Sequence, residues 1–166
     1  YLVGESYGGV RVMALAHELQ QDQWMYLNGV VLVSPADYEL RYESGGIILP
    51  VVDFPYLTAT AWYHQRLNNE MQSSSLADVI KASEEFAYDK LLPALAKGGS
   101  LGNDEKTLLA ERISSLTGID VKEILDNNLI ISTNFFWKEL LRDEGYTIGR
   151  LDSRYKGIDS KDSGTY

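Results

Sequence analysis

The chain has 166 residues, 45% of them hydrophobic, which is enough to bury the core of one domain with a small appendage. Its 15 basic and 24 acidic residues give a formal net charge of -9, which disfavours nucleic acid and anionic membrane surfaces as partners. The sequence contains no cysteine, which excludes disulfides, thiolate metal sites and a cysteine nucleophile, and no apolar run approaches the roughly 20 residues that span a bilayer.

The N-terminal stretch has the pattern of a strand, a turn, a helix and a second strand. Tyr1-Leu2-Val3 is apolar and leads into the glycine-rich residues 4–9. Residues 27–33 are almost continuously apolar and β-branched, as in a parallel strand covered on both faces. Between them, apolar residues recur with helical spacing at Val10, Met13, Ala14 and Leu19. This order predicts one βαβ unit and hence the α/β class.

The start of the sequence predicts that the chain is a fragment of a longer one. Its first residue is Tyr1 rather than Met, and the first predicted strand has no earlier strand beside which to pair. A sheet cut in this way leaves apolar edges open, and open edges recruit other chains. We therefore expect self-association through the exposed strands.

Helical patterns dominate after Ser34-Pro35-Ala36-Asp37. We predict helices over residues 55–67, 76–96, 103–117, 120–125 and 134–144. Pro93 is expected to kink or end the second of them. Asn103 or Asp104 is expected to cap the third, with Gly118 closing it, and Asp120 with Glu123 imitates a capping box for the fourth. Residues 146–151 read as a strand after Gly145, and residues 152–166 as loop.

Residues 4–8 have the form G-x-S-x-G at a predicted strand-to-helix turn. In such a turn the central serine occupies a sharp bend, and we expect Gly4 and Gly8 to be required because larger side chains would clash. Ser6 would then present its hydroxyl at the top of the sheet as a nucleophile. The backbone N–H of Tyr7 would supply half of an oxyanion hole at the helix N-terminus. The alternative is a glycine-rich turn in which Ser6 merely caps the helix.

The string Gly-Glu-Ser-Tyr-Gly-Gly at residues 4–9 resembles the nucleophile elbow of the serine carboxypeptidases. The resemblance continues through Leu49-Pro50, residues 59–64 (ATAWYH), residues 138–142 (KELLR) and residues 149–154 (GRLDSR), and it is strongest to the bacterial branch. It implies an α/β-hydrolase that removes C-terminal residues from peptide substrates without a cofactor, in a periplasmic or secreted location. It also implies a partial hydrolase core over residues 1–37, a helical cap insertion over 38–150 and a return loop over 151–166.

The same resemblance implies a substrate-binding role for Glu5, directly before the nucleophile. A carboxyl group there would hydrogen-bond the terminal carboxylate of the substrate, which requires Glu5 to be protonated through burial or a neighbouring acid. An ordinary paired acid is the alternative. The acid and base of the triad are expected beyond residue 166, and without them the fragment is predicted to be inactive.

Two histidines could in principle serve Ser6 within the chain. His17 lies about 16 Å along the predicted helix, at about 1.5 Å per residue, so it cannot reach the serine. Asp37 and His64 keep the hydrolase order of nucleophile, acid and base, which leaves a small self-contained esterase as an alternative. A non-catalytic interaction module is a third hypothesis. Asp159 and Asp162 lack the closing carboxylate of a calcium loop, so no metal site is predicted.

The aromatic residues of two predicted helices have two interpretations. They either line the substrate side of the cap or belong to its core, where aromatic residues at helical spacing are more usually found. The residues concerned are Trp62, Tyr63, Phe135, Phe136 and Trp137.

Overall fold

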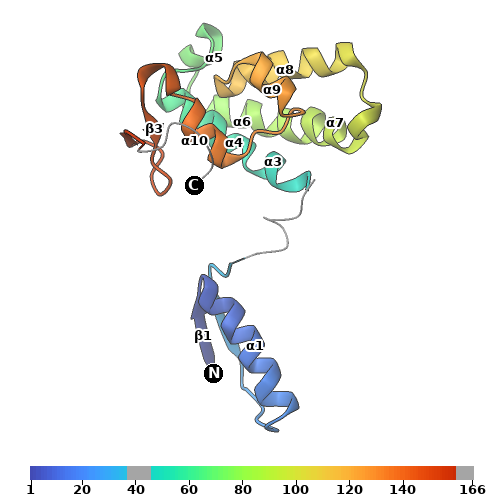
Figure 1. The fold of residues 1–166 in the computed structure, drawn as a ribbon, viewed down its shortest axis with the longest axis vertical. Helices are drawn as coiled ribbons and strands as arrows, with labels where there is room; N and C mark the ends of the chain where they lie inside the picture. Colours follow the sequence, from blue (N-terminus) through green and yellow to red (C-terminus); the bar gives the residue numbers. More distant parts are fainter. Residues whose placement is uncertain (37–45, 160–166) are drawn as a thin grey trace. The chain divides into compact units, whose positions relative to one another are not determined.

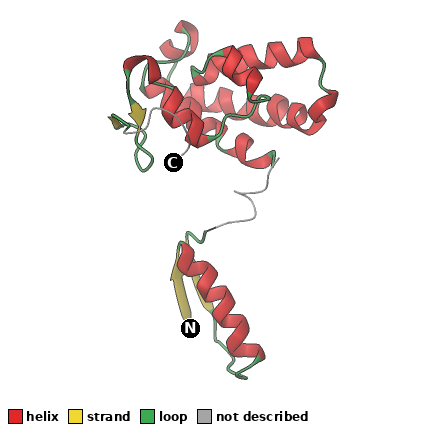
Figure 2. Cartoon of the chain, in the orientation of Figure 1, coloured by secondary structure: helices red, strands yellow, loops and turns green. Residues whose placement is uncertain are grey.

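The computed structural model describes residues 1–36 and 46–159. The chain forms two compact units, Tyr1–Ser44 and Gly45–Tyr166, which we call the βαβ unit and the helical unit (Figure 1). Helices dominate the described residues, beside one parallel and one antiparallel pair of strands (Figure 2). The predicted mixed α/β class is therefore confirmed at this level.

The βαβ unit has the predicted order of elements. Strand β1 (Leu2–Glu5) leads into helix α1 (Tyr7–Gln21), and the chain returns as strand β2 (Val30–Val33). The two strands pair in parallel, with Leu2 opposite Val30 and Glu5 opposite Val33. A parallel pair requires a crossover connection, and α1 is that crossover.

The buried side of α1 agrees in part with the predicted apolar repeat. Its buried residues are Gly9 and Val12. Of the predicted repeat, Val10 and Leu19 are half-buried, whereas Met13, at 48%, and Ala14 are exposed. The apolar pattern missed Gly9 because glycine carries no hydrophobic side chain to register in such a pattern. All four residues of β2 are exposed within the described residues, Val31 at 49%, so the coverage expected for this strand on both faces is absent there.

The helical unit consists of short helices around one core. Its elements are α3 (Ile48–Val52), α4 (Phe54–Tyr63), α5 (Asn69–Ser73), α6 (Leu76–Phe86), the π-helical turn η1 (Ala87–Leu91), α7 (Leu92–Lys97), the 3-10 turn η2 (Gly98–Ser100), α8 (Asn103–Thr117), α9 (Val121–Asp126), α10 (Thr133–Glu139) and the 3-10 turn η3 (Arg142–Glu144). An antiparallel hairpin of β3 (Thr147–Ile148) and β4 (Lys156–Gly157) follows. Phe54, Leu57, Ile113, Leu116 and Phe136 are among its fully buried core residues.

The helix predicted over residues 76–96 does not end at Pro93, but it is interrupted in the turn before it. The irregularity lies before the proline, at η1, where the N–H of Leu92 donates to the carbonyl of Ala87, five residues back. Pro93 then occupies the first turn of α7, which continues to Lys97. Since proline has no N–H to donate, the widened turn before it accommodates the ring within a continuing helix.

The ends of several helices also differ from the predictions. Neither Asn103 nor Asp104 caps α8, because Gly102 holds the N-cap position without a side-chain bond. By contrast, Gly118 closes α8 in the left-handed conformation at φ 72°, as predicted. The side chain of Asp120 caps α9 and accepts the N–H of Lys122 at 2.7 Å.

The fifth predicted helix and the strand after it are shorter than predicted. The helix predicted over 134–144 is α10 followed by η3, and it stops before Gly145 (φ 76°). The strand predicted over 146–151 shrinks to β3, and the predicted loop from 152 contains β4, its pairing partner. Pairing across a hairpin depends on residues outside either local pattern, so the sequence pattern did not reveal it.

Three of the five aromatic residues that were predicted either to line the cap or to belong to its core can be assigned from their contacts or burial. Phe136 is fully buried in the core. The indole N–H of Trp62 donates to the carbonyl of Ser74 at 3.1 Å, and that of Trp137 donates to the Tyr56 hydroxyl at 2.8 Å. These contacts favour the core interpretation for these three residues.

Candidate active site

Ser6 lies between β1 and α1 in an unusual backbone conformation. Its φ is 52° and its ψ is -122°, a region that residues other than glycine rarely adopt. A conformation of this kind costs about 1–3 kcal/mol and persists only where the surroundings enforce it. Ser6 is the N-cap of α1, yet its side chain makes no capping hydrogen bond. The alternative of an ordinary capping serine is therefore wrong.

Three backbone hydrogen bonds enforce this conformation. The N–H of Ser6 donates to the carbonyl of Val33 at 3.0 Å, which extends the β1–β2 pairing to the turn. The carbonyl of Ser6 accepts two bonds, from the N–H of Gly9 and from the N–H of Ala36, both at 3.0 Å. The sequence patterns did not point to Ala36, although Pro35, two residues after the end of β2, is a residue typical of turns.

The glycines around Ser6 are not equally constrained. A Cβ at Gly4 would lie 2.2 Å from the carbonyl oxygen of Gly8, a separation that no side chain tolerates. A Cβ at Gly8 would meet nothing within 4 Å, whereas one at Gly9 would lie 2.7 Å from Cβ of Pro35. The prediction that a side chain would clash is therefore confirmed at Gly4 and is wrong at Gly8. The second clash occurs at Gly9, because Pro35 packs against the first turn of α1.

Tyr7 and Glu5 flank the candidate nucleophile. Tyr7 is the first residue of α1, so its N–H lies at the positive end of the helix dipole beside Ser6. Glu5 is the last residue of β1 and its side chain is exposed. The described residues therefore do not provide the burial that the predicted substrate-binding role of Glu5 requires. Ser6, Tyr7 and Glu5 are all exposed and adjacent to one another at one end of the strand pair.

The alternative esterase triad would use Asp37 and His64 with Ser6. His64 follows α4 in the helical unit, where its Nε2 lies 2.7 Å from the carbonyl oxygen of Ser153 and must carry the donated proton. Its ring also meets that of Tyr63 edge-on, with centroids 5.1 Å apart. Asp37 lies outside the described residues. These contacts give His64 a structural role in tying α4 to the hairpin loop.

The segment 149–155 forms an ordered loop between β3 and β4. The carboxylate of Asp152 accepts hydrogen bonds from the guanidinium of Arg154 at 2.9 and 2.6 Å and from its backbone N–H at 3.0 Å. These bonds lower the pKa of Asp152 to about 2, with the guanidinium contact as the main cause. The hydroxyl of Thr60 donates to that of Ser153 at 3.1 Å, which anchors the loop to α4.

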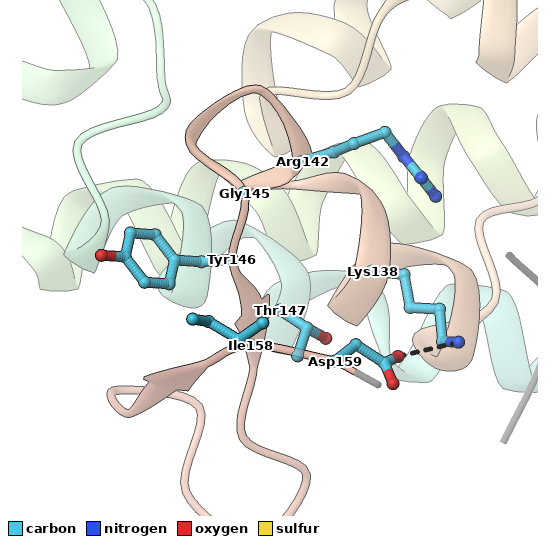
Figure 3. A pocket seen from close by; sticks show the side chains of 7 residues that line it. All are labelled: Lys138, Arg142, Gly145, Tyr146, Thr147, Ile158 and Asp159. Carbon is cyan, nitrogen blue, oxygen red and sulfur yellow. Dashed lines mark ion pairs between the residues drawn. The ribbon is translucent and has the colours of Figure 1, made fainter. Parts of the chain in front are cut away.

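A cavity of about 260 Å³ lies beside this hairpin (Figure 3). It is lined by Lys138, Arg142, Gly145, Tyr146, Thr147, Ile158 and Asp159. The side chain of Lys138 is 9% exposed, and its ammonium group lies 2.9 Å from the carboxylate of Asp159. This ion pair attaches residue 159 to α10, so the described part of the predicted return loop, residues 151–159, packs within the helical unit.

The described residues offer neither a metal-ligand cluster nor a membrane-spanning helix. Across residues 1–36 and 46–159, no three acidic or histidine side chains gather into a group that could hold a metal ion. No helix in this described part is both long enough and apolar enough to cross a bilayer.

Comparison of the chain with models of known protein families, with curated proteins and with solved structures gave no match.

Proposed function

We propose that this chain supplies the nucleophile elbow and the helical cap of a serine carboxypeptidase-like α/β-hydrolase, with Ser6 as nucleophile. The observation that carries the proposal is the backbone of Ser6, at φ 52° and ψ -122° in a strand-to-helix turn, with no capping bond from its side chain. Strain of this kind is typical of functional residues held by their surroundings. The resemblance of residues 4–9 to the carboxypeptidase elbow supports the same chemistry.

In the proposed reaction, Oγ of Ser6 attacks the carbonyl carbon of the last peptide bond. Its proton passes to a histidine outside residues 1–166, which an acid orients. The oxyanion that forms accepts a hydrogen bond from the N–H of Tyr7, where the dipole of α1 stabilises negative charge. In its protonated form the carboxyl group of Glu5 donates a hydrogen bond to the free carboxylate of the substrate, with the burial that this requires supplied by parts of the enzyme outside residues 1–166. The tetrahedral intermediate then collapses, the C–N bond breaks, and the C-terminal amino acid leaves with the proton returned by the histidine. Water hydrolyses the remaining acyl-enzyme ester, which releases the shortened peptide and restores Ser6, and no cofactor takes part in these steps.

The nucleophile is tested with a fluorophosphonate probe on the enzyme that contains this chain. We expect stoichiometric labelling at Ser6 that Ser6→Ala abolishes, while Ser73→Ala, at an exposed serine of the helical unit, leaves labelling unchanged. Activation requires an assembled triad, so the 166-residue chain alone should label no faster than its Ser6→Ala variant. Absence of labelling in the containing enzyme would contradict the proposal.

The same probe separates the alternatives. A self-contained esterase would label within minutes as the isolated chain, and an interaction module would label in neither form. The hydrogen bond of His64 to the carbonyl of Ser153 weighs against the esterase, because its Nε2–H is already used.

The role of Glu5 has its own test. Glu5→Ala should raise KM for peptides with a free C-terminal carboxylate and leave KM for the matching C-terminal amides unchanged. Equal effects on both substrates would return Glu5 to a structural role.

A further inference from the structure

The segment that leaves β2, residues 33–36, contacts the backbone around Ser6 at three points. The carbonyl of Val33 accepts the N–H of Ser6, and the N–H of Ala36 donates to the carbonyl of Ser6, both at 3.0 Å. The side chain of Pro35 packs where a Cβ at Gly9 would otherwise lie. We call residues 33–36 the β2 exit segment.

The geometry of the β2 exit segment explains how both bonds reach one residue. Ser34 adopts φ 41°, which is rare for a residue other than glycine, and so reverses the chain directly after β2. The reversal brings the N–H of Ala36 back over the turn between β1 and α1. Ser6 is thereby held from its N–H side and its carbonyl side by two residues that are three positions apart.

The approach of Pro35 to α1 depends on a glycine at position 9. A Cβ there would lie 2.7 Å from Cβ of Pro35 and 3.2 Å from its Cα, so a side chain would have to displace the exit segment or the helix. Position 8 faces open space, with nothing within 4 Å of a Cβ. The two adjacent glycines therefore form a comparison pair, because an added methyl group would meet the exit segment at position 9 and nothing at position 8.

We infer that the β2 exit segment is a positioning element for the nucleophile. Pro35 and the N–H of Ala36 hold the strained backbone of Ser6 and, through it, the relation between Oγ of Ser6 and the N–H of Tyr7. The inference rests on the proposed function, since it assigns the segment to the reaction of Ser6. Its effect should fall on the chemical step, because the segment touches the nucleophile rather than the substrate.

The test compares Gly9→Ala with Gly8→Ala. In the enzyme that contains this chain, Gly9→Ala should lower kcat on the order of 10- to 100-fold with little change in KM, as expected for a displaced reacting group. Gly8→Ala should leave kcat within about twofold, since its added methyl group meets nothing. In the Pro35→Gly background, where the 2.7 Å contact is gone, Gly9→Ala should lower kcat by a much smaller factor.

A structural readout on the same enzyme accompanies the kinetics. Hydrogen exchange at the Ala36 amide, read by mass spectrometry, should accelerate in Gly9→Ala and stay slow in Gly8→Ala. If Gly9→Ala does not fold, Ala36→Pro removes the same N–H donor without adding bulk to α1, and it should lower kcat by a similar factor.

Three outcomes decide the inference. Equal kcat and equal Ala36 exchange in Gly9→Ala and Gly8→Ala would overturn it. It would also be overturned if Gly9→Ala lowered kcat in the Pro35→Gly background by as large a factor as in the chain with Pro35. If instead the exchange results hold while Ser6→Ala retains turnover, the β2 exit segment braces the turn but the proposed function is wrong.

Discussion

The βαβ unit and the helical unit bury their residues very differently. Among residues 1–36 only Gly4, Gly9 and Val12 are buried, and the whole of β2 is exposed. The helical unit instead encloses a continuous core that draws on nearly all of its helices. A parallel strand pair with apolar faces is stable only when other layers cover it, whereas short helices cover one another. The comparison indicates that the helical unit is self-sufficient and that the βαβ unit requires neighbours.

The largest expected effect lies in the helical core. Phe136→Ala removes a fully buried ring and should lower the free energy of unfolding by about 3–5 kcal/mol. Leu108→Ala, at a residue that is 67% exposed, should change it by less than about 0.5 kcal/mol. Urea unfolding followed by circular dichroism measures both. A loss below about 1 kcal/mol for Phe136→Ala would contradict a self-sufficient helical core.

The second prediction concerns the exposed strands of the βαβ unit. We expect the chain to self-associate at tens of micromolar, because its apolar strands recruit other copies and salt screens the net charge of -9. Light scattering should give a mass well above 18.6 kDa, and Val31→Lys should bring it toward that value. Leu108→Lys places the same charge on the helical unit and should change nothing. A monomeric chain unaffected by Val31→Lys would show that the strands do not associate.

A smaller effect is expected where two loops of the helical unit meet. Gly118 adopts φ 72°, and a Cβ there would lie 2.7 Å from the carbonyl oxygen of Arg66. Gly118→Ala should therefore lower the free energy of unfolding by about 2 kcal/mol, combining backbone strain with the clash. Gly145 has a similar left-handed conformation, at φ 76°, but nothing lies within 4 Å of a Cβ there, so Gly145→Ala isolates the strain and should cost about half as much. Equal losses would remove the steric argument at Gly118.

The smallest effect is a titration in the hairpin loop. Hydrogen bonds from Arg154 lower the pKa of Asp152 to about 2 from its ordinary 3.8. Since the folded pKa is the lower one, this interaction stabilises the loop fully above about pH 4 and is lost as the pH falls through about 2. Carboxyl chemical shifts in NMR should follow that midpoint. In Arg154→Ala the midpoint should return toward 3.8, and an unchanged midpoint would exclude the guanidinium as the cause.

Predictions from the sequence succeeded where a feature depends on residues close together in the chain. The strand, turn and helix around Ser6, the cap at Asp120 and the left-handed stop at Gly118 all follow from neighbours within a few positions. Hydrophobic spacing and turn chemistry act at that range. The order of elements in the βαβ unit and the longer helices of the helical unit therefore follow from the amino-acid sequence by itself, whereas α3, α5 and β4 were not predicted.

The tertiary structure decided which of two adjacent glycines packs against Pro35 and which group His64 contacts. Pro35 reaches Gly9 from a different element, and Ser153 reaches His64 from 89 positions away. The pairing of β3 with β4 and the bond from Ala36 to Ser6 are of the same kind. Such contacts join segments distant in sequence, so no local pattern records them. They depend on how the elements pack, and packing is determined by the shape of both partners at once.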